Sequence, residues 1–81
     1  MARLELLMQA ADLLAQGDWQ RAHVIAQEDE SQTGCLIHGI VHVLEGDLDN
    51  ARYWYRRAGR EFPKVFSIES ELASLREMLS V

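Results

Sequence analysis

Two histidines in the middle of the chain are spaced so that their side chains could act together chemically. His38 and His42 stand four residues apart. Glu45 follows three residues later, and Cys35 lies one turn before His38. On a helix these positions share one face, where two imidazoles can bind one metal ion and a carboxylate or thiolate can complete the ligand set. The spacing is not that of a zinc protease, because Gly39 stands where a glutamate base would follow the first histidine.

A second group of residues is aromatic and cationic. Tyr53, Trp54 and Arg57 lie with Asn50 on one side of the helix predicted after Gly46. Aromatic and arginine side chains are enriched in protein interfaces. A guanidinium can also bind a carboxylate or phosphate through two hydrogen bonds. The alternative is an ordinary solvated cationic face whose arginines pair with nearby acids.

The net charge of −5 is unevenly distributed along the 81 residues. Residues 1–51 carry −7, residues 52–64 carry +4 and residues 65–81 carry −2. The acidic total argues against general nucleic-acid binding, so we expect no nucleic-acid partner. The basic segment leaves an anionic ligand or an acidic protein surface open as partners.

Cysteine content, the N-terminal residues and the lengths of the apolar stretches indicate the compartment. The single cysteine, Cys35, excludes an intrachain disulfide and fits a reducing cytoplasm. The first residues lack the cationic start and apolar run of a signal peptide, and no apolar stretch approaches the length of a membrane span. We therefore expect a cytoplasmic protein that does not contact membranes.

Helical periodicity runs through the chain, and no segment alternates apolar and polar residues as a strand does. The predicted helices cover residues 4–16, 19–28, 33–45, 48–61 and 67–79. Gly17 and Gly46 are expected to end the first and third helices. Asp18 and Asp47 are expected to cap the helices that follow, and Pro63 cannot continue a helix interior. The sequence therefore predicts an all-α fold in one domain, residues 1–81.

An internal repeat groups these helices. The motif Gly-Asp-x-x-x-Ala occurs twice, 29 residues apart, as stacked helical hairpins require. In the second copy the small residues Gly39 and Ala51 would let two helices approach closely, and Tyr55 would fill the space between hairpins. The second copy resembles a tetratricopeptide repeat. The positions that carry this resemblance are Gly39, Gly46, Ala51, Tyr55, Ala58 and Pro63.

The resemblance implies an architecture and a function. It implies two antiparallel helix hairpins, about residues 3–30 and 32–64, and a capping helix at about residues 67–79. It also implies a module that binds protein. The stretch from Glu45 to Arg57 is similar to a small group of bacterial and fungal proteins as well, a likeness that implies no activity. In a tetratricopeptide hairpin His38 and His42 would face the fourth helix and be explained by packing.

Two functions are therefore expected. The preferred one is a protein-interaction module that self-associates as a homodimer, because so short a chain leaves apolar surface uncovered. The residues expected in this interaction surface are Tyr53, Trp54, Arg57, Leu36, Ile40 and Val43. The alternative is a ligand- or metal-binding pocket, with or without enzymatic activity, between the third and fourth helices. The residues expected in this pocket are His38, His42, Glu45 and Asn50.

The sequence gives little support for a catalytic activity. No nucleophile–base pair and no glycine-rich phosphate loop can be placed. Packing can account for the histidines, so the preferred prediction contains no metal, no cofactor and no catalytic residue, and the metal-binding pocket stays the alternative. His23 is isolated on a short helix, so we expect it to be a surface residue.

Overall fold

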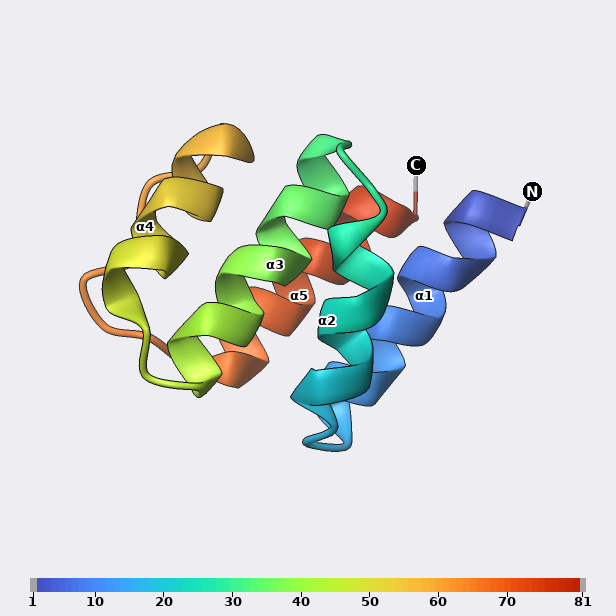
Figure 1. Ribbon diagram of the computed structural model, residues 1–81, viewed down its shortest axis with the longest axis horizontal. Coiled ribbons are helices and arrows are strands. Elements are labelled where there is room, and N and C mark those ends of the chain that lie inside the picture. The colour runs from blue at the N-terminus through green and yellow to red at the C-terminus, as the bar shows by residue number, and fades with distance from the viewer. Residues whose placement is uncertain (1, 81) are drawn as a thin grey trace.

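The computed structural model describes residues 2–80 and consists of five helices joined by short connections (Figure 1). The helices are α1 (Ala2–Ala15), α2 (Trp19–Gln27), α3 (Gln32–Leu44), α4 (Leu48–Arg57) and α5 (Ile68–Leu79). No strand occurs within the described range, so the all-α prediction is confirmed. Among these helices, none is both long enough and apolar enough to cross a membrane.

Helix α3 is the centre of the molecule. The hairpin of α1 and α2 packs on one side of it and α4 on the other, while α5 lies across α1 and α3 from behind (Figure 1). Helix α3 takes the central position because it is the most apolar of these helices, and it is buried on nearly every side. Its continuously buried residues run from 34 to 42. The side chains of α3 therefore form the surface against which the neighbouring helices pack.

The turns that close the hairpins have the predicted chemistry. Gly17 and Gly46 adopt φ angles of +83° and +84°, which L-residues rarely take. After each glycine the amide of the aspartate, Asp18 or Asp47, donates to a carbonyl five residues earlier, as in a Schellman motif. Each aspartate side chain then accepts from an amide in the first turn of the next helix. One glycine–aspartate pair thus ends one helix and begins another.

Helix α4 is shorter than predicted. It ends at Arg57 rather than near residue 61. Gly59 adopts a φ angle of +73°, and the amide of Arg60 donates to the carbonyl of Tyr55 at 3.0 Å. A third Schellman motif therefore stops this helix before Pro63 is reached.

The apolar face of α3 is covered from within the chain. Leu36 and Ile40 are both 0% exposed, and Val43 is half-buried against the same core. Helix α5 packs on α3 and contributes Leu75, which is also 0% exposed. Leu36 and Ile40, which were expected in the interaction surface, are therefore buried within the chain, on the face of α3 against which α5 packs.

The close approach of α3 and α4 depends on one small residue. A β-carbon placed on Gly39 would lie 2.6 Å from Cδ1 of Tyr55. The Tyr55 ring is 1% exposed, and its hydroxyl donates to the Glu71 carboxylate of α5 at 2.6 Å. Tyr55 thus fills the space between α3 and α4 and ties α4 to α5. With α4 held this closely, Trp54, the residue before Tyr55, reaches His38 of α3.

Candidate functional site

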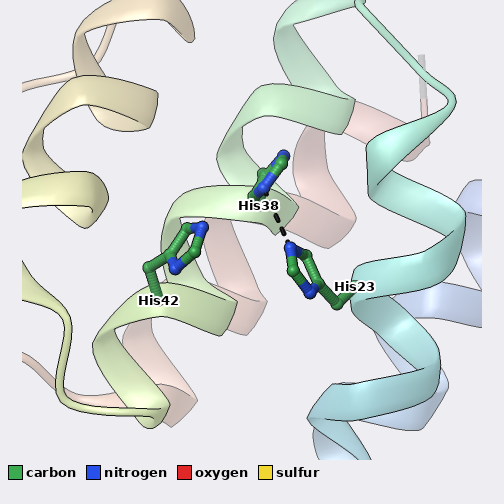
Figure 2. A group of neighbouring side chains, drawn as sticks. All are labelled: His23, His38 and His42. Carbon is green, nitrogen blue, oxygen red and sulfur yellow. Dashed lines mark hydrogen bonds between the residues drawn. The ribbon is translucent and has the colours of Figure 1, made fainter.

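The polar face of α3 meets side chains from two other helices. His38 and His42 project from successive turns of α3, and His23 approaches them from α2 (Figure 2). Trp54 approaches from α4 on the other side. These three histidines are all the histidines of the chain. We call them the histidine cluster.

Short distances join the rings of the histidine cluster. The Nε2 atoms of His23 and His38 lie 3.0 Å apart, a hydrogen bond in which one ring donates and the other accepts (Figure 2). His38 and His42 are stacked, with centroids 4.9 Å apart and ring planes 18° apart. His23 meets His42 edge-on at 5.2 Å between centroids. One ring nitrogen from each histidine lies within 4.8 Å of one from each of the others.

Glu45 orients the ring of His42. Its Oε1 lies 2.6 Å from Nδ1 of His42. The carboxylate of Asp47 lies farther away, 3.9 Å from the same nitrogen. A carboxylate on Nδ1 fixes the ring and its tautomer, which leaves Nε2 of His42 free to face the other two rings.

Burial favours the uncharged form of two rings in the cluster, His23 and His38. His38 and His42 are 7% and 8% exposed, and His23 is half-buried. Burial, followed by the neighbouring imidazoles His23 and His42, lowers the pKa of His38 to about 4. Burial also lowers the pKa of His23, with His42 adding to the effect and Glu45 opposing it. At neutral pH these two rings are therefore neutral, and each has one unprotonated ring nitrogen.

Trp54 connects the histidine cluster to the surface. Its ring stacks on His38 with a centroid distance of 3.9 Å and an interplanar angle of 10°. The guanidinium of Arg57 lies over the indole at 5.1 Å, and Tyr53 meets it edge-on at 5.1 Å between ring centroids. Tyr53 is 43% exposed and Arg57 is also exposed. We call Tyr53, Trp54 and Arg57 the aromatic–arginine surface.

The predicted pocket residues are only partly brought together. His38, His42 and Glu45 form one connected group, as described above. The Asn50 side chain instead donates to the Asp47 carboxylate at 2.6 Å on the exposed start of α4. Cys35 is buried, and its thiol is directed to the Glu30 carbonyl at 3.9 Å rather than to the histidines. Burial raises the pKa of this thiol, which disfavours a nucleophilic thiolate.

His23 is the residue that sequence reasoning placed wrongly. It was expected on the surface, yet it forms the third side of the histidine cluster. The available signal was its position next to Ala22, which is 0% exposed on the face of α2 that packs inward. Periodicity within α2 could not show which residues of α3 that face would meet.

Comparison of the chain with known protein families, curated proteins and solved structures finds no match. A functional assignment therefore depends on the geometry of the histidine cluster and of the aromatic–arginine surface.

Proposed function

We propose that this chain is a small protein-interaction module, built like a pair of tetratricopeptide hairpins with a capping helix, and that its partner is a second copy of itself. The observation that carries the proposal is the aromatic–arginine surface. Trp54 is held in place between His38 and Arg57, and Tyr53 stands exposed beside it. Preorganised aromatic and arginine side chains lose little entropy on binding and are typical of interface hot spots.

Charge favours a second copy as the partner. Between residues 2 and 80, neither Arg56 nor Arg57 forms an ion pair with a carboxylate. Glu30, exposed in the loop before α3, is close enough for its charge to help raise the pKa of Arg57, after the larger effect of the hydrogen bond with Tyr53. Adjacent patches of opposite charge that do not pair within one chain can pair twice across a two-fold axis.

The test uses purified protein in sedimentation equilibrium. We expect a monomer–dimer equilibrium that weakens as salt is added, because exposed charges are screened. Trp54→Ala and Arg57→Glu should each shift the equilibrium toward monomer. Arg21→Glu is the matched control, because Arg21 is an exposed arginine at the start of α2, where an acid is tolerated.

A charge swap makes this test specific. Glu30→Arg alone should also weaken the dimer, and the double variant Arg57→Glu with Glu30→Arg should restore it. A strict monomer at high micromolar concentration overturns self-association. A double variant that associates no more strongly than either single variant overturns the Arg57–Glu30 contact between copies.

A further inference from the structure

The histidine cluster has a feature that packing does not require. Three imidazoles from two helices, 15 and 4 residues apart in sequence, converge on one point in the interior (Figure 2). Burying a polar ring is unfavourable unless its nitrogens find partners. Apolar side chains of similar size would fill the same space between α2 and α3 without that requirement. The convergence therefore points to a use for the ring nitrogens.

The geometry matches the needs of a tetrahedral metal ion. Zinc–imidazole bonds of about 2.0–2.1 Å at tetrahedral angles place ligand nitrogens roughly 3.3 Å apart. The Nε2 atoms of His23 and His38 lie 3.0 Å apart. All three ligand nitrogens lie within 4.8 Å of one another, so the third ring must move by no more than about 1.5 Å to complete the set. A rotation of the side chain supplies a movement of that size.

The surroundings supply the two other requirements of a metal site. A ligating histidine normally has its second ring nitrogen hydrogen-bonded to a carboxylate or carbonyl, and Glu45 meets Nδ1 of His42 in this way. Ligand rings must also be neutral, since protons compete with the metal. The burial of His38, which is 7% exposed, favours its neutral form over the charged one.

We infer that His23, His38 and His42 bind one divalent transition metal ion of the zinc class through their Nε2 atoms, with Glu45 orienting His42. Imidazole ligands suit Zn²⁺, Co²⁺, Ni²⁺ and Cu²⁺, whereas Mg²⁺ and Ca²⁺ prefer oxygen. Three protein ligands leave one coordination position for water or another ligand. The site does not depend on self-association, because all three histidines come from one chain.

A second ligand set, made of His42, Glu45 and Asp47, fits less well. The Asp47 carboxylate caps α4 and accepts from the side chain of Asn50 at 2.6 Å. Glu45 is exposed and already bonded to His42. Clusters of exposed acids are common without a metal, so the set that includes His23 is the one we propose.

The experiment titrates the full chain, purified without a polyhistidine tag, with Zn²⁺ by calorimetry and with Co²⁺ by visible absorption. We expect one ion per chain, d–d bands of tetrahedral Co²⁺, and a higher melting temperature with Zn²⁺. Each of His23→Gln, His38→Gln and His42→Gln should abolish the Co²⁺ bands. Glu45→Gln should retain the site and weaken it by about 10- to 100-fold, as loss of such an orienting carboxylate does.

Two controls separate this site from others. Cys35→Ala should bind the metal as the parent does, because the thiol lies outside the cluster. Trp54→Phe should bind Co²⁺ with little change, because a phenyl ring can still stack on His38. Any change in tryptophan fluorescence on metal binding should be smaller in this variant, because Trp19 is then the remaining indole. Circular dichroism confirms that each variant is helical before it is titrated.

Absence of binding by the folded parent protein, or binding that survives His23→Gln and His42→Gln, overturns the inference. So does a Co²⁺ spectrum without tetrahedral bands. If the dimer forms equally with and without metal, the inferred metal site still stands. If the protein binds metal but stays a monomer, only the self-association proposal is overturned. The two proposals can therefore fail separately.

Discussion

At the residue scale, the polar residues that matter most are those whose partners come from other helices. His23 gains its role from His38 of α3. Asp29 lies in the loop between α2 and α3, in an acidic stretch whose composition is typical of a solvent-exposed loop. It is nevertheless only 8% exposed. Its carboxylate accepts from Arg3 of α1 at 3.0 Å and from the amide of Ser31 at 2.9 Å. Asp29 thus joins α1 to the start of α3.

The contribution of Asp29 to the stability of the protein should depend on pH. Its burial raises the pKa, but the hydrogen bonds of Arg3 and Ser31 together outweigh burial and lower it below the ordinary value. A lowered carboxyl pKa gives stability that is fully present above the unfolded pKa, about 3.9, and that is lost as pH falls through the folded pKa. Because Arg3 is largely exposed, we expect Asp29→Asn to cost only about 1 kcal/mol at pH 7.

Urea unfolding at pH 7 and well below pH 4 measures this effect. The difference between Asp29→Asn and the parent should shrink as the pH falls, since the parent carboxylate becomes protonated too. Asp49→Asn, at a fully exposed carboxylate, is the control and should change stability little at either pH. A difference that is constant with pH would show that the charge of Asp29 is not what stabilises this connection.

At the element scale, local chemistry made most boundaries predictable. The glycine–aspartate turns fixed the ends of α1 and α3, because a left-handed glycine and a capping carboxylate act within a few residues. The predicted end of α4 was wrong because the helix stops before Gly59, which carries the same signal as Gly17 and Gly46, and does not continue toward Pro63. The convergence of His23 with α3 could not be predicted, since it depends on how two helices are placed and not on either one.

The crossing of α3 and α4 should depend on Gly39. In Gly39→Ala the added carbon would lie 2.6 Å from Cδ1 and 2.9 Å from Cε1 of Tyr55, a ring that is fully packed and cannot move freely. We expect a loss of about 1–3 kcal/mol in the free energy of unfolding, as overpacking produces, despite the better helix propensity of alanine. Equilibrium denaturation in urea measures the loss.

The Tyr55→Leu variant provides the control for the Gly39→Ala prediction. In Tyr55→Leu the ring is gone, so adding Gly39→Ala should cost nothing further and can recover the propensity gain of up to about 1 kcal/mol. If Gly39→Ala costs the same in both backgrounds, the contact with Tyr55 does not limit the approach of the two helices.

At the scale of the whole molecule, α5 decides which surface is left for function. The apolar residues of α3 were expected to form part of an interaction surface that a second copy of the chain would cover. In the structure α5 covers them, with Leu75 completely buried in the same core as Leu36 and Ile40. Tyr53 is among the large side chains that stay exposed, and it belongs to the aromatic–arginine surface, which has the histidine cluster beneath it. The two proposed functions both lie on this side of the molecule.

Leu75→Ala tests this role of α5. Truncating a fully buried leucine should cost about 2–5 kcal/mol in the free energy of unfolding, much of the stability of a domain this small. Because α5 would then hold the α3 face less tightly, we also expect increased binding of a hydrophobic dye and concentration-dependent association that salt does not weaken. Urea denaturation, dye fluorescence and sedimentation measure these three effects. Val65→Ala, at a side chain that is 86% exposed, is the control and should leave all three unchanged. If Leu75→Ala is as stable as the parent, or associates only through salt-sensitive contacts, then α5 is not what keeps the α3 face closed.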